Sequence, residues 1–346
     1  MKRILFAASE YGSFNMVYRV MKACSGRYGI GYMGLDPASG EKPIIKEPMI
    51  GIKKINNGQL KNFDIFVTGS SALSDLEYTL WGRAGDMNKR SICILDQHKQ
   101  LEERFTRNGK RILPDAICVM NEDARKSLLK LGVDKDKIIV TGSPYLADIA
   151  GYKISASRRR ALRKRLCASN KKVVTFCTEY MVKAAQKPRH GYDENVLLTD
   201  ILDRLNNLGQ YDFRLYIRLH PNDEKRLYGK YAGKTFGNTE VIIAEDDPEY
   251  KMLQVSDIVI GMSSIILVAA SMLSLPIISY QPAKDKKRIF KYNEIIGRNL
   301  VTDRRALSRA ISDRLLKKSG GAKLKSGALY NSIDRILSII ENRKHA

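Results

Sequence analysis

The chain has 346 residues, 44% of them hydrophobic and 28% charged, which is ordinary for a soluble globular protein and enough for two domains. Its five cysteines are scattered and form no C-x-x-C pair, so we expect buried reduced thiols rather than a disulfide framework or a zinc site. The net charge of +23 indicates a polyanionic partner (nucleic acid, an anionic membrane surface, or an acidic glycan or lipid), or else a lysine-rich solvated surface.

The first half of the chain alternates apolar, β-branched runs with helical patterns. Its opening apolar run is too short for a signal peptide and predicts a strand. The predicted strands are Ile4–Ala8, Ile30–Met33, Ile65–Thr68, Ile92–Leu95, Ala116–Met120 and Lys137–Thr141. The predicted helices are Phe14–Ala23, Leu73–Trp81, Gln97–Phe105 and Asn121–Leu131.

The second half continues the same alternation. The predicted strands are Val173–Cys177, Phe213–Arg218, Glu240–Ala244, Asp257–Ile260 and Pro276–Tyr280. The predicted helices are Glu194–Leu208, Pro248–Gln254, Ser264–Leu273 and Arg304–Lys317. Strands that alternate with helices in this way predict parallel sheets covered by helices on both faces.

A break between Gly142 and Lys172 separates the two halves. We therefore expect an α/β protein of two doubly wound, Rossmann-like domains, residues 1–145 and 146–325, facing a cleft. A last helical pattern within residues 326–346 is expected to pack back on the first domain. Ligands of such folds bind outside the carboxyl ends of the strands.

The stretch from Ile258 to Ser279 has no charged residue and is about long enough to cross a bilayer. Gly261 and Pro276 interrupt it, together with several serines. Because buried parallel strands also give continuous apolar runs, we interpret it as strand, tight turn, helix and strand instead of a membrane span.

Two basic side chains mark the end of one predicted strand. Alternation along the strand puts Arg218 and His220 on the same face, and Pro221 stops the strand because it has no backbone donor. An imidazole at the carboxyl edge of a sheet can donate to a phosphoryl oxygen. The alternative is a structural histidine that caps the strand.

A second anion-binding pattern follows another predicted strand. Gly261 permits a sharp turn, and the serine pair Ser263-Ser264 opens an apolar helix. The N–H groups of a first helical turn and two hydroxyls suit a phosphate or diphosphate, although an ordinary N-cap gives the same pattern.

These motifs, R-x-H-P and then S-S before an apolar helix and a proline-started strand, resemble the second domain of GT-B glycosyltransferases. The resemblance is to capsule and surface-polysaccharide enzymes: polysialyltransferases, Kdo transferases and teichoic-acid glycerophosphotransferases. It implies that His220, Ser263 and Ser264, with Arg218, contact the phosphate of a nucleotide donor, often CMP- or CDP-linked. Many relatives have a ribose-binding glutamate where this chain has Val268.

An inverting GT-B transferase needs a base in its first domain and no metal or cofactor. Two carboxylates compete for this role, Glu10 after the first strand and Asp96 after the fourth, with His98 close to the latter in sequence. We favour Glu10 as the base, with Asp96 and His98 shaping the site. Either carboxylate can instead cap its following helix.

Thr178 and Glu179 follow the first strand of the second domain, where they are expected to line the cleft and touch the donor; a plain loop is the alternative. The run Arg158–Arg165 predicts a basic helix suited to anionic lipid. Nucleic acid is a disfavoured partner, because no helix-turn-helix, RNP or zinc-finger pattern occurs.

The sequence thus favours a metal-independent GT-B glycosyltransferase. It would move a sugar from a nucleotide-activated donor onto an acidic surface-glycan or lipid-linked acceptor, as a cytoplasmic enzyme peripheral to the inner membrane face. One alternative is a sugar-nucleotide 2-epimerase of the same fold, against which the missing acidic residues after the serine turn count. The other is a noncatalytic protein that binds an anionic polymer.

Overall fold

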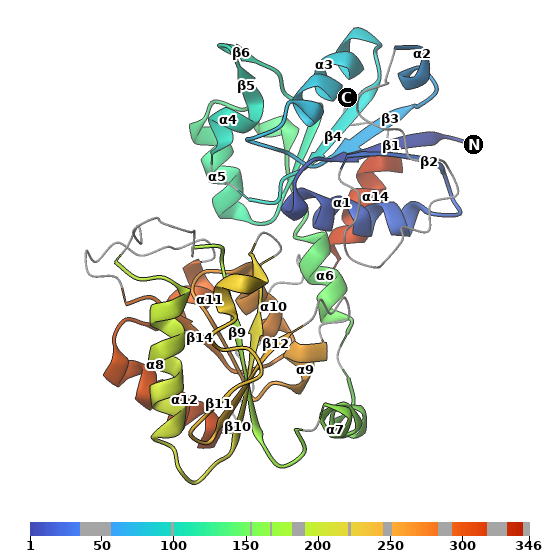
Figure 1. Ribbon diagram of the computed structural model, residues 1–346. Coiled ribbons are helices and arrows are strands. Elements are labelled where there is room, and N and C mark those ends of the chain that lie inside the picture. Colours follow the sequence, from blue (N-terminus) through green and yellow to red (C-terminus); the bar gives the residue numbers. More distant parts are fainter. Residues whose placement is uncertain are drawn as a thin grey trace. The chain divides into compact units, whose positions relative to one another are not determined.

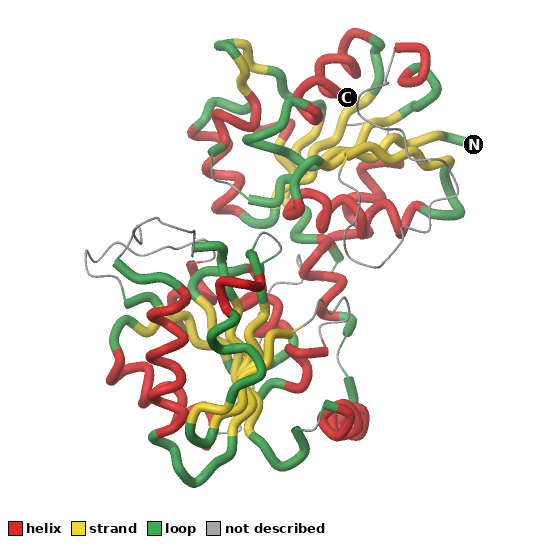
Figure 2. Tube along the Cα trace, viewed as in Figure 1, coloured by secondary structure: helices red, strands yellow, loops and turns green. Residues whose placement is uncertain are grey.

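The computed structural model describes residues 1–34, 57–97, 100–152, 154–166, 168–181, 191–220, 223–244, 251–282, 293–316 and 331–341. The chain divides into two compact units, one made of Met1–Asp148 with Ser326–Ala346 and the other of Ile149–Lys325. Each unit is a predominantly parallel sheet with helices packed against it (Figures 1 and 2). The predicted α/β, Rossmann-like fold class is therefore confirmed.

The sheet of the first unit has six parallel strands in the order β2-β1-β3-β4-β7-β8. They are β1 (Arg3–Ala8), β2 (Gly29–Gly34), β3 (Ile65–Thr68), β4 (Arg90–Ile94), β7 (Ala116–Val119) and β8 (Ile138–Val140). Every residue of β1, β3 and β7 except Arg3 is buried, as expected for strands covered on both faces.

The first unit's helices are α1 (Tyr11–Cys24), α2 (Asn57–Leu60), α3 (Leu76–Asp86), α4 (Leu101–Phe105), α5 (Glu122–Lys130) and α14 (Ser332–Glu341). Helix α14, at the far end of the chain, lies beside α1 (Figure 1). Ile336, Leu337, Ile339 and Ile340 form its buried face, at the spacing of an amphipathic helix. The last helix is thus part of the first unit's core.

The sheet of the second unit has seven strands in the order β11-β12-β10-β9-β13-β14-β15, in which only β11 runs antiparallel to its neighbour. They are β9 (Lys172–Cys177), β10 (Phe213–Arg218), β11 (Thr235–Phe236), β12 (Thr239–Ala244), β13 (Ile258–Gly261), β14 (Ile277–Tyr280) and β15 (Leu300–Val301). The helices are α7 (Ala156–Arg165), α8 (Glu194–Asn206), α9 (Lys251–Val255), α10 (Ile265–Met272), α11 (Asn293–Arg298) and α12 (Arg304–Leu316). Helix α6 (Pro144–Ala150) begins in the first unit and ends in the second.

Alternate residues of β9 point to opposite faces of this sheet. Val174 and Phe176 pack with the buried side of α8 and α12, which lie together on one face. Val173 packs on the other face with residues of α7 and α9. The strand's period of two therefore places one apolar layer on each side.

An aspartate directly before a strand fixes the register of three strand pairs. Asp64, Asp115 and Asp257 precede β3, β7 and β13, and their carboxylates accept from the backbone N–H of Arg3, Ser91 and Val173, each at 2.8 Å. Each aspartate N–H donates in return to the carbonyl of the same partner, at 2.7–3.0 Å. These reciprocal hydrogen bonds keep the amino ends of the neighbouring strands in register.

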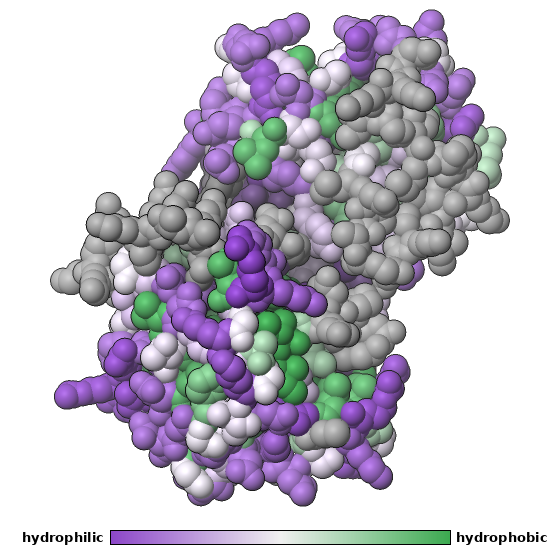
Figure 3. All heavy atoms as spheres, viewed as in Figure 1, coloured by the Kyte–Doolittle hydropathy of each residue, from purple (hydrophilic) through white to green (hydrophobic). Residues whose placement is uncertain are grey.

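The charged segment 158–165 lies on α7. Arg159 and Arg163 bind Asp257 and the carbonyl oxygens of Gln254 to Ser256, so this side of the helix is anchored to the second unit. Arg158, Arg160, Lys164 and Arg165 are exposed. Hydrophilic residues cover much of the visible face of both units (Figure 3). The expected contact with anionic lipid stays a prediction.

The apolar stretch that resembled a membrane span folds as β13, a turn, α10 and β14, as predicted. Among the helices in the described residues, none has the length and apolar character needed to span a bilayer. Cys24, Cys93, Cys118 and Cys177 are buried free thiols, which confirms that expectation for four of the five cysteines.

Helices α3 and α4 begin three and four residues later than predicted. Helix α3 starts at Leu76, because the hydroxyls of Ser71 and Ser74 accept from backbone N–H groups between Leu73 and Leu76 and hold that segment in turns. Helix α4 starts at Leu101, after Gln100, whose φ of 53° is left-handed and cannot continue a helix.

Replacing Asp257 with alanine should lower the free energy of unfolding by about 2–3 kcal/mol, because Arg159, Arg163 and the Val173 N–H lose a charged acceptor. Urea-induced unfolding of the full chain measures this loss. Asp203→Ala, which removes an exposed carboxylate of α8, is the control and should change stability by less than about 0.5 kcal/mol. Equal stabilities of the two variants would contradict the register role of Asp257.

Candidate functional site

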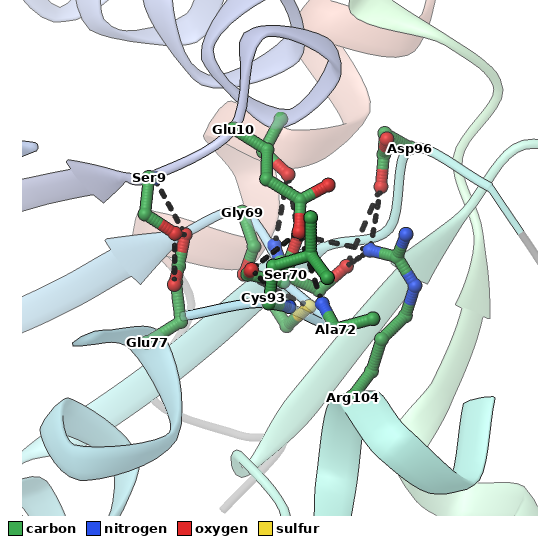
Figure 4. A network of polar contacts seen from close by, with 12 residues as sticks. Ser9, Glu10, Gly69, Ser70, Ala72, Glu77, Cys93, Asp96 and Arg104 are labelled. Atoms are coloured by element: carbon green, nitrogen blue, oxygen red, sulfur yellow. Dashed lines mark hydrogen bonds and ion pairs between the residues drawn. The ribbon is translucent and has the colours of Figure 1, made fainter. Parts of the chain in front are cut away.

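The first unit gathers polar side chains at the carboxyl ends of three neighbouring strands (Figure 4). Ser9 and Glu10 follow β1, Gly69 to Ala72 follow β3, and Asp96 follows β4. Because β1, β3 and β4 are adjacent and parallel, residues far apart in sequence meet at this edge.

Asp96 is a buried carboxylate with a buried cationic partner. Its Oδ1 lies 3.1 Å from Arg104 Nη1 and 3.4 Å from the Ser70 hydroxyl. Arg104, which is 1% exposed, also donates to the carbonyl oxygen of Ser70 at 2.9 Å. Burial raises the pKa of Asp96 to about 6; Arg104 opposes this rise and Glu10 adds to it. A carboxyl with such a pKa can both accept and donate a proton near neutral pH.

Glu10 binds the loop that follows β3. Its Oε1 accepts from the Ser71 hydroxyl and, at 3.0 Å, from the backbone N–H of Ala72. Its backbone precedes α1, but its side chain makes no capping hydrogen bond to that helix. The Glu10 side chain therefore does not cap α1, contrary to the helix-cap alternative. Its role as a base stays a prediction.

Two glycines allow the close approach on which this network depends. A Cβ at Gly12, in the first turn of α1, would lie 2.6 Å from Asp96 Oδ2. A Cβ at Gly69 would lie 2.3 Å from the Cβ of Ser13. The Ser13 hydroxyl donates to the Ser70 carbonyl at 2.5 Å across this contact. The start of α1 is therefore pressed against the ends of β3 and β4.

Glu77, which the sequence analysis did not single out, is a further carboxylate in this region. It is 1% exposed, and its oxygens accept from the backbone N–H of Ser9 at 2.7 Å and from the Ser9 hydroxyl at 2.7–2.8 Å. Burial is the main cause that raises its pKa, with the hydrogen bonds from Ser9 acting against it. On sequence alone, Glu77 is an ordinary acidic residue inside the predicted helix Leu73–Trp81.

In the second unit, Arg218 ends β10 and His220 follows it, both half-buried. The backbone N–H of His220 donates to the Thr178 hydroxyl at 2.7 Å and to Asp223 Oδ2 at 3.1 Å. The His220 ring stacks on Tyr180, with ring centroids 5.9 Å apart. The ends of β9 and β10 are thus joined through Thr178, as adjacent parallel strands predict.

The serine turn after β13 contains the predicted residues Ser263 and Ser264 and binds a third, Glu179. Ser264 caps α10, its hydroxyl accepting from the backbone N–H of Ile266 at 3.3 Å. Ser263 is buried, and its hydroxyl donates to Glu179 Oε2 at 2.9 Å. The backbone N–H groups of Met262 and Ser263 donate to Glu179 Oε1. The groups predicted to bind phosphate therefore hold a carboxylate here.

A buried glutamate that the sequence analysis missed supports this arrangement. Glu194 Oε1 accepts from the backbone N–H of Glu179 at 3.1 Å and of Met181 at 2.8 Å. Glu194 is fully buried, and this burial raises its pKa despite the two hydrogen bonds. The sequence position of Glu194 did not indicate this role, because a glutamate at the start of a helix is common.

The structure thus brings together Glu10 and Asp96 in one network, and it joins Thr178 to His220 and Glu179 to Ser263. His98 lies outside the described residues. Val268 is 2% exposed on α10, so it is a core residue. Among the residues that the structure describes, no cluster of histidine, cysteine or acidic residues could hold a metal ion.

The UDP-N-acetylglucosamine 2-epimerase family model matches residues 94–337, more than two thirds of the chain. The fold is similar to a Methanocaldococcus jannaschii UDP-GlcNAc 2-epimerase in complex with UDP-GlcNAc and UDP (TM-score 0.66, 14% identity, 99% of both chains). It is also similar to S. aureus MnaA with UDP (0.65, 14%, 99% of this chain and 96% of that one) and a Rickettsia africae glycosyltransferase (0.60, 14%, 98% of both). No curated protein sequence matches this chain.

These findings confirm the GT-B-like fold and correct the predicted activity. The glycosyltransferase prediction, with its capsule-enzyme group and glycan or lipid acceptor, is wrong, because the matching family is that of the epimerases. The error has a physical cause. A histidine at one strand end and serines at another suit a phosphate whichever reaction follows, so these motifs do not separate two chemistries on one fold.

Asp96 should make the chain less stable as the pH rises. Its folded pKa of about 6 lies above its unfolded value, so the stability it contributes is complete below about pH 4 and is lost up to about pH 6. Between pH 4 and pH 8 the wild type should lose about 2 kcal/mol of unfolding free energy relative to Asp96→Asn. Urea unfolding of both proteins at the two pH values measures this difference, and parallel pH profiles would rule it out.

Proposed function

The chain belongs to the UDP-N-acetylglucosamine 2-epimerase family, and we propose that it inverts the configuration at C2 of the sugar in a UDP-linked N-acetylhexosamine. The observation that carries this proposal is the extent of the family match. Residues 94–337 include Asp96 in the first unit and the strand ends with Thr178, His220 and Ser263 in the second.

Inversion at C2 requires that the C2–H bond be broken and that a proton return to the opposite side. The electron pair left at C2 can form a C1–C2 double bond while the C1–O bond breaks and the diphosphate leaves with that bond's electrons. The reverse sequence, with protonation from the other side, gives the epimer. This chemistry calls for one group that exchanges protons with C2 and others that hold the diphosphate.

Asp96 suits the proton exchange. Its pKa of about 6 places both protonation states within reach at neutral pH, and Arg104 and Ser70 fix its carboxylate. Glu10, which contributes to that raised pKa and is held by Ala72, is the candidate second acid or base. We assign the proton exchange at C2 to Asp96, because burial brings its pKa to about 6, close to neutral pH.

The second unit supplies groups that suit a diphosphate. Arg218 and His220 stand at the end of β10, and the hydroxyl and N–H groups of the Met262–Ser264 turn follow β13 at the same edge of the sheet, with β9 between the two strands. Solved structures of similar fold contain UDP, which favours a uridine nucleotide over the CMP or CDP expected from sequence. We propose these residues as the nucleotide-binding set.

The proposal is tested by incubating the protein with UDP-N-acetylglucosamine in D₂O without any acceptor. Proton NMR should show UDP-N-acetylmannosamine and loss of the C2 proton signal from both sugars, because the returning proton comes from solvent. Asp96→Asn should lower the turnover number about 100-fold or more. Asp123→Asn, an exposed carboxylate of α5, is the control and should keep full activity. A wild-type protein that binds UDP but neither epimerises nor exchanges would refute the proposal.

Gly12→Ala should lower turnover on the order of 100-fold while the protein stays folded. The added Cβ would meet Asp96 Oδ2 at 2.6 Å, and the carboxylate would have to move away from its position beside Arg104. Gly85→Ala in α3 is the matched control, since its Cβ meets no atom within 4 Å. Steady-state kinetics with circular dichroism check both variants, and wild-type turnover in Gly12→Ala would show that Asp96 tolerates displacement.

A further inference from the structure

The turn between β13 and α10 already holds an anion, the side chain of Glu179. The backbone N–H of Met262 donates to Glu179 Oε1 at 3.2 Å, the N–H of Ser263 donates to the same oxygen, and the Ser263 hydroxyl donates to Oε2 at 2.9 Å. Met262 and Ser263 are fully buried, whereas Glu179 is only half-buried. Three donors on buried residues thus converge on one carboxylate that borders solvent.

The surrounding residues position Glu179 for this contact. Glu194, which is fully buried, accepts from the backbone N–H of both Glu179 and Met181. Between them, Tyr180 has a left-handed φ of 60°, a conformation that costs free energy for a residue with a Cβ. Its ring stacks on His220. A buried carboxylate and a strained residue therefore shape the segment that carries Glu179 into the turn.

A phosphoryl group cannot share these donors with Glu179. Each N–H and the hydroxyl has one proton to donate, and two anions in contact repel each other. The donors are backbone groups and a buried serine, so they stay in place, whereas the half-buried carboxylate can swing toward water. Binding of a phosphoryl group at this turn is therefore an exchange of one anion for another.

We propose that Glu179 is an internal competitor that occupies the phosphoryl-binding groups of Met262 and Ser263 and is displaced when the nucleotide diphosphate binds. Such a competitor weakens ligand binding, because its own three hydrogen bonds must break before the ligand can bind. These bonds form again when the product leaves. This inference rests on the proposed function only for the identity of the ligand as a nucleoside diphosphate.

The sign of an affinity change tests the proposal. Isothermal titration calorimetry would measure binding of inorganic pyrophosphate, UDP and uridine to the wild type, Glu179→Gln and Glu179→Ala. We expect pyrophosphate and UDP to bind at least tenfold more tightly to Glu179→Ala, and more tightly to Glu179→Gln, with uridine affinity unchanged. Glu224→Ala removes an exposed carboxylate of the same unit and controls for the change in net charge; it should leave the affinities within twofold of wild type.

Unchanged or weaker pyrophosphate binding in both Glu179 variants would overturn the proposal and would mean that Glu179 stabilises the turn or contacts the ligand itself. Glu179→Gln keeps the shape of the side chain, so it provides the test if the alanine variant unfolds. Acetate provides a second test. At high concentration it should compete with pyrophosphate in Glu179→Ala but not in the wild type, and an absence of competition in both would count against an emptied carboxylate site.

The outcomes also separate this inference from the proposed function. If the protein does not epimerise UDP-N-acetylglucosamine, the change in pyrophosphate affinity still decides the role of Glu179. If the protein epimerises its substrate but pyrophosphate binding does not tighten in the variants, the activity stands and the competitor role falls.

Discussion

The hydrogen-bonded aspartates at the amino ends of the strands are the constraint on which the rest of the structure depends. Asp64, Asp115 and Asp257 each give and receive a backbone hydrogen bond with the first residues of a neighbouring strand. A slip of one residue would turn every side chain of a strand to the other face. Because these bonds exclude the slip in pairs β1–β3, β4–β7 and β9–β13, the residues after the strands meet at defined positions.

At the opposite ends of the strands, carboxylates again accept from backbone N–H groups, but in a different environment. Glu10 and Glu77 in the first unit, and Glu179 and Glu194 in the second, bind loop N–H groups at the carboxyl edge. Burial raises the pKa of Glu77, Glu194 and Asp96, so these groups are costly to ionise. Backbone N–H groups thus hold carboxylates at both edges: those at the amino edge align the strands, and those at the carboxyl edge include buried groups with a raised pKa.

The sequence predicted the parts of the structure that depend on local pattern. The strands β3 and β10 have the predicted limits, since apolar runs between polar residues define buried strands. Asp96 was found because it directly follows a strand. Glu77 and Glu194 were missed because each lies in a predicted helix, where an acidic residue has an ordinary explanation. Their partners Ser9 and Met181 are brought to them by tertiary packing. The contact between Glu179 and Ser263 joins residues 84 positions apart, and no local pattern predicts it.

The motifs could not predict the class of reaction, and the reason is chemical. In a transfer reaction a carboxylate takes a proton from an acceptor hydroxyl, whereas in a C2 epimerisation it takes a proton from carbon; in both, the diphosphate leaves from C1. The residues that stabilise the leaving diphosphate are therefore equivalent in the two reactions, and the carboxylate differs only in which atom lies beside it. Asp96 and His220 would be selected under either hypothesis. The family match covers residues 94–337, so it depends on the sequence of both units and not only on the motif residues Arg218, His220, Ser263 and Ser264. For this reason it separates two reactions that the motifs alone do not distinguish.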